Sequence, residues 1–221
     1  MNKIAKELAL AALEIGAIKV QPSNPFTWTT GYRMPIYNDN RLLTGSLKHR
    51  MLVASGFKDV LSRRGEKFDL IAGVATGAIA HATTLANELD LPLVYIREKA
   101  KEHGVGRQVE GVYSQGQRAV VIEDLISTGK SSAAAVEGLR NTGVTANLCV
   151  SIFNYGFATA IEAFKAIDTE VISLLTFPEL LAIMKEVKKL SDSEYEMLSS
   201  WSEKPFEWGE KNGFPKIEKE K

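Results

Sequence analysis

Five apolar runs, separated by stretches with helical spacing, constrain the fold of this chain more than any other feature. The runs occupy residues 69–75, 91–96, 119–124, 146–153 and 171–175, and helical patterns fill 78–89, 131–143 and 157–167. A longer helix, capped by Ser46 and ended by Gly65, precedes the first run. Short apolar strands that alternate with helices predict a parallel sheet covered on both faces, with right-handed crossovers. We therefore expect an α/β fold with a mostly parallel sheet flanked by helices.

Both ends of the chain carry additions to this core. Apolar residues at helical spacing within 4–15 predict an amphipathic N-terminal helix, and aromatic and β-branched residues around Gly31 predict two short strands joined by a turn. From Phe177 the chain is predicted to be helical to about Glu203, then irregular and too polar to bury much surface. The simplest organisation is a single domain over 1–221. It has an N-terminal hood-like segment at 1–42, an α/β core at 43–175 and a helical C-terminal tail at 176–221.

Composition and charge argue against several classes of protein. Lys and Arg number 27, as do Asp and Glu, so the formal net charge is zero and lacks the basic excess of a non-specific nucleic-acid binder. No stretch approaches the roughly 20 apolar residues that span a bilayer, and the N-terminus lacks the pattern of a signal peptide. The single cysteine, Cys149, fits a reducing compartment and is predicted to be a buried strand residue. We expect a cytoplasmic protein with no nucleic-acid or membrane partner.

The stretch VVIEDLISTGKSS, residues 120–132, carries the strongest chemical signal. Ligands of open parallel sheets bind beyond the carboxyl ends of the strands, which places Glu123 and Asp124 at the ligand edge. The small hydroxylic residues that follow lead into a helix, whose N-terminal N–H groups and positive dipole end suit a phosphate. Gly129 lets the backbone approach the anion closely. Two carboxylates beside a phosphate cradle are compatible if the ligand is a ribose 5-phosphate, whose hydroxyls donate to the acids.

Two other interpretations of this stretch are weaker. Gly129-Lys130-Ser131 matches the end of a nucleotide-binding P-loop, but that motif requires a glycine at position 124, where this chain has Asp. An ordinary strand–turn–helix junction with a capping Ser or Thr would explain residues 127–132 alone. It does not explain the adjacent acidic pair.

The stretch resembles the phosphoribosyl-pyrophosphate motif of type I phosphoribosyltransferases, and EDLISTGKS resembles the form found in bacterial orotate phosphoribosyltransferases. SNPFTWTTGYRMPIYNDNR at 23–41 is similar to that family's orotate-side hairpin, GVATGAIAHA at 73–82 to its pyrophosphate-side loop, and YIREKAKEHGVGRQVEG at 95–111 to its mobile catalytic loop. The similarity covers roughly residues 1–155 in order. It implies a type I phosphoribosyltransferase-like fold. The implied reaction moves phosphoribosyl from 5-phosphoribosyl 1-pyrophosphate (PRPP) to orotate, giving orotidine 5′-monophosphate and pyrophosphate, in pyrimidine biosynthesis.

The resemblance assigns roles residue by residue. Glu123 and Asp124 would hold the ribose 2- and 3-hydroxyls and favour the cationic sugar of an oxocarbenium-like displacement. The catalytic residues would be Lys101, His103 and Asp124. Mg²⁺ is the expected cofactor, held mainly by substrate and water and not by protein side chains. The positions that match PRPP contacts are Arg97, Lys99, Lys101, His103, Glu123, Asp124, Leu125, Ile126, Ser127, Thr128, Gly129, Lys130 and Ser131.

The loop at 95–111 carries four potential cations within residues 97–103, which together would clamp an anion. Gly104 and Gly106 would allow the loop to close. A solvated charged loop is the alternative, and the interleaved Glu98 and Glu102 weaken a purely electrostatic argument. By resemblance, the loop reaches into the neighbouring subunit's site, which implies a homodimer with shared sites.

Contacts to the base are the least defined. Ser127 matches a position that touches orotate, and Arg33 is a candidate for the orotate carboxylate, with backbone N–H groups near Thr29 and Thr30 as the alternative. Many relatives have lysine where this chain has Thr29, some have lysine where it has Gly77, and the stretch SIFNYGF lacks an arginine that assists orotate in some members. A second branch of the family shares most of these absences.

Two other functions stay open. One is another type I phosphoribosyltransferase with a different base, against which the N-terminal hairpin argues. The other is a non-catalytic regulator that senses PRPP and binds nucleic acid. Retention of Lys101 and His103 and the zero net charge argue against that regulator.

Overall fold

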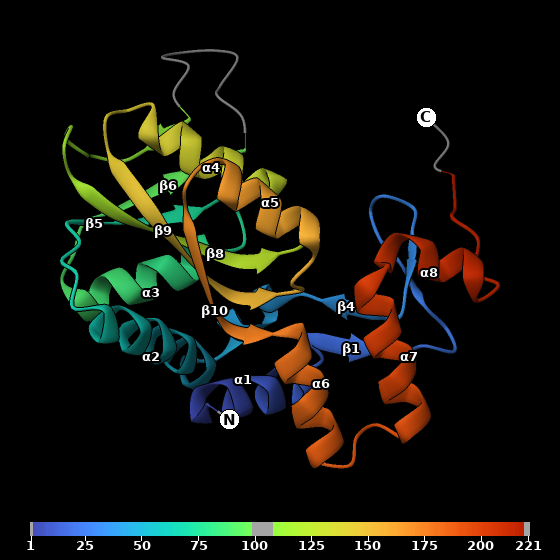
Figure 1. Ribbon diagram of the computed structural model, residues 1–221. Coiled ribbons are helices and arrows are strands. Elements are labelled where there is room, and N and C mark those ends of the chain that lie inside the picture. The colour runs from blue at the N-terminus through green and yellow to red at the C-terminus, as the bar shows by residue number, and fades with distance from the viewer. Residues whose placement is uncertain (1, 99–107, 219–221) are drawn as a thin grey trace.

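The computed structural model describes residues 2–98 and 108–218, which form a twisted central sheet with helices on both faces (Figure 1). The sheet order is β10-β9-β8-β5-β6-β7, and each neighbouring pair is parallel except β6 and β7. The strands are β5 Leu70–Val74, β6 Leu93–Ile96, β7 Val109–Glu110, β8 Arg118–Ile126, β9 Thr145–Asn154 and β10 Glu170–Thr176. The predicted α/β fold and its five parallel strands are confirmed. The two-residue β7 was not predicted, because it lies at the end of a polar loop.

The helices that flank the sheet create two separate apolar cores. The helices on one face are α2 Leu47–Arg64 and α3 Ile79–Leu89, and those on the other are α4 Lys130–Arg140 and α5 Ala158–Ala166 (Figure 1). Along β8, Val120 and Ile122 belong to the core with α2 and α3, whereas Val121 belongs to the core with α4 and α5. Successive side chains of a strand point to opposite faces, so a continuously apolar strand serves both cores.

The N-terminal part matches its predicted form. It contains α1 Lys3–Glu14, two short antiparallel pairs and a 3-10 helix, η1 Asn40–Gly45. The outer pair is β1 Ile18–Val20 with β4 Ile36–Asn38, and the hairpin itself is β2 Phe26–Thr27 with β3 Arg33–Met34. Gly31 makes the hairpin turn at φ 83°, where its N–H donates to the carbonyl of Trp28 at 2.8 Å. The predicted Ser46 cap and Gly65 end of α2 are also present.

The C-terminal part departs from expectation. Helices α6 Phe177–Glu186 and α7 Asp192–Glu203 are confirmed, but α8 Pro205–Lys211 occupies the segment that was predicted to be irregular. Trp208 in α8 is 4% exposed, so the expectation that this segment buries little is also wrong. Its few apolar residues lie among Lys and Glu, which lower the average hydrophobicity of the segment, while Pro205 suits the first turn of a helix. No helix within the described residues is long and apolar enough to cross a membrane.

Candidate active site

The two carboxylates of the 120–132 motif lie in different environments. Strand β8 runs to Ile126, two residues beyond the acidic pair. Glu123 is buried, and both of its oxygens are engaged: Oε2 accepts from the hydroxyl of Ser132 at 2.6 Å, and Oε1 accepts from the N–H of Asp124 at 3.0 Å. Burial, and next the charge of Asp124, raise the pKa of Glu123 to about 8. Glu123 therefore keeps its proton at neutral pH, and Asp124 is the half-buried carboxylate that remains near the surface.

Asp124 is fixed by residues far away in the sequence. Its carbonyl accepts from the side-chain amide of Asn40 at 2.5 Å, and the carbonyl of Asn40 lies 3.3 Å from Nε2 of His81. Since a carbonyl only accepts, Nε2 carries the hydrogen, and burial lowers the pKa of this histidine. The carboxylate of Asp124 lies against Gly77, where an added Cβ would overlap it. The contacts of Asn40 and Gly77 with Asp124 were not predicted from the sequence.

The N-terminus of α4 has the form expected of an anion site. Gly129 precedes the helix at φ 76°, and no side chain caps α4 at this described end. The first helical bond runs from the N–H of Ala133 to the carbonyl of Gly129 at 2.8 Å, so the N–H groups of residues 130–132 have no helical acceptor. A Cβ at Gly129 would approach Cα of Ala160 in α5 to 2.9 Å. The capping interpretation is thus not supported, and the free N–H groups and dipole suit a phosphate.

The side chains of residues 125–131, which form this cradle with the N-terminus of α4, differ in their accessibility. Ser127 and Thr128 are half-buried, as is Leu125, whereas Lys130 and Ser131 are exposed and Ile126 is buried. Backbone and hydroxyl donors are therefore both present where β8 turns into α4.

The predicted catalytic loop is described only at its two ends. The N–H of Arg97 donates to the carbonyl of Gln108 at 2.9 Å, and the side-chain amide of Gln108 donates back to the carbonyl of Arg97 at 3.1 Å. The Arg97 guanidinium also lies 3.5 Å from the carboxylate of Glu110. Arg97 is thus held at the base of the loop. Lys99, Lys101 and His103 lie outside the described residues.

The hairpin approaches the motif through aromatic side chains. The ring of Trp28 lies 5.3 Å from that of Tyr155, whose N–H donates to the carbonyl of Ile126 at 3.1 Å. The Arg33 guanidinium donates to the carbonyl of Pro25 at 2.8 Å and lies 5.9 Å from the ring of Phe214. These contacts hold Arg33 within the hairpin and against the C-terminal segment, and do not join it to residues 123–131.

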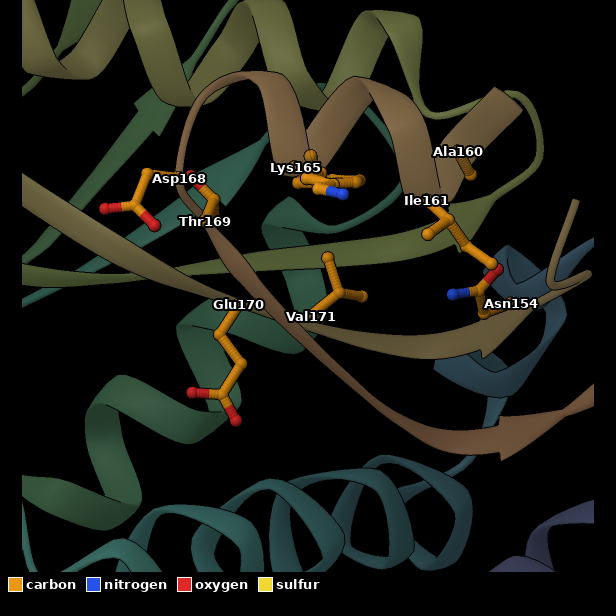
Figure 2. A pocket seen from close by; sticks show the side chains of 9 residues that line it. Asn154, Ala160, Ile161, Lys165, Asp168, Thr169, Glu170 and Val171 are labelled. Carbon is orange, nitrogen blue, oxygen red and sulfur yellow. The ribbon is translucent and has the colours of Figure 1, made fainter. Parts of the chain in front are cut away.

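A surface hollow of about 500 Å³ lies elsewhere, between α5 and β10 (Figure 2). Its lining includes Asn154, Lys165 and Glu170, but no residue of the 120–132 motif. The hollow therefore does not coincide with the cradle. No group of three or more His, Cys, Asp or Glu side chains suited to a metal occurs within residues 2–98 and 108–218.

The fold and the cradle define a phosphoribosyltransferase. The family model described as a phosphoribosyl transferase domain matches residues 47–197, which include the whole sheet, the acidic pair and the start of α4.

Individual relatives indicate which family of phosphoribosyltransferases the chain is similar to. An orotate phosphoribosyltransferase of Listeria monocytogenes is 41% identical over 206 residues, which cover 93% of this chain and 99% of the relative. One of Lactiplantibacillus plantarum is 38% identical over 209 residues, with 95% and 99% covered. The crystal structure of orotate phosphoribosyltransferase from Aeropyrum pernix superposes with a TM-score of 0.72 at 29% identity, and 83% and 99% of the two chains are covered. The chain belongs to the orotate phosphoribosyltransferase family.

Proposed function

We propose that this protein transfers the phosphoribosyl group of PRPP to orotate, giving orotidine 5′-monophosphate and pyrophosphate in pyrimidine biosynthesis. The observation that carries the reaction class is the uncapped N-terminus of α4, which begins five residues after the acidic pair of β8. The choice of orotate is supported by the bacterial relatives of that name, which match nearly the full length of the chain. We also infer a single-domain cytoplasmic enzyme, which the one buried thiol, Cys149, supports.

In this proposal the 5-phosphate of PRPP binds the free N–H groups of α4 and the hydroxyls of Ser127, Thr128 and Ser131. Asp124 accepts a hydrogen bond from a ribose hydroxyl, and its negative charge stabilises the sugar as it becomes cationic. Glu123, whose oxygens accept from the hydroxyl of Ser132 and the N–H of Asp124, is proposed to contact the second hydroxyl.

The cations of the loop would stabilise the departing pyrophosphate. Arg97, Lys99, Lys101 and His103 are proposed for this task, and Lys101 and His103 are proposed to act on the partner subunit's site in a homodimer. Large apolar side chains are exposed at Tyr37, Leu42 and Leu47, on either side of the Asn40 that holds Asp124, which supports a subunit contact near the site.

Mg²⁺ is the proposed cofactor. Hard oxygens suit this ion, and the pyrophosphate of PRPP supplies them. We propose that substrate oxygens and water hold it and that no protein side chain does so. When bound, the ion would neutralise charge on the pyrophosphate.

For the base, Ser127 and Arg33 remain the proposed contacts. Ser127 is supported by its place at the end of β8, one residue after the carbonyl that Tyr155 contacts. Arg33 is supported by its place in the hairpin, although its guanidinium already has partners there.

The direct test is an ultraviolet assay of orotate consumption with PRPP and Mg²⁺, run beside Asp124→Asn. We expect turnover of orotate, none of uracil, hypoxanthine or adenine, and a large loss in the variant. Turnover of one of the other bases, or no turnover with tight RNA binding, would reject the proposal.

Mixing two inactive variants tests the shared sites. Each site is proposed to combine Asp124 of one subunit with Lys101 of the other. Unfolding and refolding an equal mixture of Lys101→Ala and Asp124→Asn chains makes about half of the dimers mixed, and each mixed dimer has one intact site. About a quarter of wild-type turnover should therefore return. No restoration, or a monomer in solution, would reject the shared loop.

A further inference from the structure

The C-terminal segment 198–218 lies beyond the matched family domain, which ends at residue 197. It comprises the end of α7, α8 and the chain that follows. In Figure 1 the red α8 and its extension lie beside the blue hairpin of β2 and β3. The C-terminal segment, which is far from the hairpin in sequence, therefore covers the hairpin that the proposed function assigns to binding of the base.

Contacts between the segment and the hairpin begin at the turn. The N–H of Ile217 donates to the carbonyl of Gly31 at 3.0 Å. The ammonium of Lys216 lies 4.5 Å from the ring centre of Tyr32, and the ring of Phe206 lies 5.0 Å from the same ring. The turn is thus contacted by backbone, charge and aromatic groups together.

A second set of contacts holds Arg33. The ring of Phe214 lies 5.9 Å from its guanidinium carbon and stacks on Trp208 at 5.9 Å and 15°. Gly209 faces the carbonyl of Arg33 closely, since an added Cβ would lie 3.1 Å from it. The side chain proposed to bind the orotate carboxylate is therefore held by α8 and its extension.

Trp201 connects these contacts with the motif. This side chain is fully buried, and its indole N–H donates to Sδ of Met34 in β3 at 3.3 Å. Its ring lies 6.5 Å from Trp28 and 5.7 Å from Tyr155, whose N–H bonds the carbonyl of Ile126. Packed rings therefore connect the C-terminal segment with Tyr155, whose backbone N–H bonds the residue before Ser127.

The hairpin depends on this support. Strands β2 and β3 have two residues each, and such a short hairpin is not stable alone. The phosphate cradle differs, because the core beneath α4 contains no residue beyond Val171 among those described. A change at Phe214, which contacts Arg33 and Trp208 and is not part of that core, should thus reach the base side and leave the PRPP side intact.

We propose that residues 198–218 position the hairpin and Arg33 for the acceptor base, so that this segment sets the affinity for orotate and not for PRPP. This inference rests on the proposed function. Phe214 is its main positioning residue, and Trp201 connects the segment with Tyr155.

The experiment compares Phe214→Ala with Phe214→Leu and with Glu207→Ala, which removes an exposed ion pair on α8. We expect the KM for orotate to rise about five- to thirtyfold in Phe214→Ala, with the KM for PRPP changed less than about twofold. Phe214→Leu, which keeps apolar packing but lacks the ring over Arg33, should recover only part of this loss, and Glu207→Ala should match the wild type. Equal rises in both KM values, or an unchanged KM for orotate, would overturn the inference.

Hydrogen exchange of the full-length Phe214→Ala protein provides a second readout that needs no particular base. Hydrogen exchange should accelerate in hairpin residues 22–36 and stay unchanged in β5, while PRPP still raises the Tm. Unchanged exchange in the hairpin would overturn the positioning role, whereas absent turnover of orotate by the intact protein would overturn the proposed function instead.

Discussion

Replacing Gly77 by alanine tests whether the carboxylate of Asp124 must stay where the structure places it. Gly77 does not have a positive φ, so alanine fits its backbone without strain. The added Cβ would overlap the Asp124 carboxylate, which is the end of a rotatable side chain. We therefore expect the carboxylate to turn away while the fold persists.

The magnitude follows from the contact that is lost. A hydrogen bond to a charged group is worth about 1.5–3 kcal/mol, so loss of the ribose contact should lower kcat/KM about 10- to 150-fold. A displaced rotamer costs about 1 kcal/mol, which lowers the Tm by about 2–4 °C for a chain of this size.

The assay measures orotate consumption at varied PRPP beside thermal unfolding. Gly45→Ala is the matched control, because an added Cβ there meets nothing within 4 Å. A Gly77→Ala enzyme within about twofold of the wild type would refute the reasoning, as would a Tm loss large enough to explain the inactivity.

Three further predictions concern single side chains. Because the pKa of Glu123 is raised to about 8, the folded protein keeps a proton that the unfolded chain loses above about pH 4.5, so this group's stabilisation is complete at low pH and declines towards pH 8. Glu123→Gln should therefore flatten the fall in unfolding free energy between pH 5 and 8 in urea titrations, and parallel wild-type and variant profiles would contradict this. Trp201→Ala, at a fully buried site, should cost about 3–5 kcal/mol in urea unfolding, and a cost below about 1 kcal/mol would contradict its central packing. Lys101→Ala should abolish most turnover while circular dichroism and oligomeric state stay unchanged, and near-wild-type kinetics would refute the role of the loop.

The sequence predicted the sheet well because its signal is local and repeated. Each strand from β5 to β10, apart from β7, is an apolar run whose residues serve one core or the other. Helix α2 was also found with its ends, since Ser46 and Gly65 have the chemistry that helix ends require.

The C-terminal segment was mispredicted because its order depends on distant partners. Trp208, Phe206 and Phe214 are isolated among charged residues, and nothing local shows that they contact Tyr32 and Arg33 in the hairpin. The contacts of Asp124 with Asn40 and Gly77 were missed for the same reason, since these residues are far apart in the sequence and only the fold brings them together.

Glu123 and Asp124 look equivalent in the sequence, but the fold places their side chains in different environments. Because β8 continues through Ile126, neighbouring side chains on this strand are directed to different surroundings: Glu123 meets Ser132 of α4, and Asp124 meets Gly77 after β5. A buried, protonated Glu123 joins the strand to the helix whose N-terminus forms the cradle, without adding charge. Asp124 is then the carboxyl group that remains beside the proposed anionic ligand. The electrostatic conflict between two carboxylates and a phosphate is thereby reduced, and in the proposed function the carboxylate of Asp124 faces the sugar as it becomes cationic.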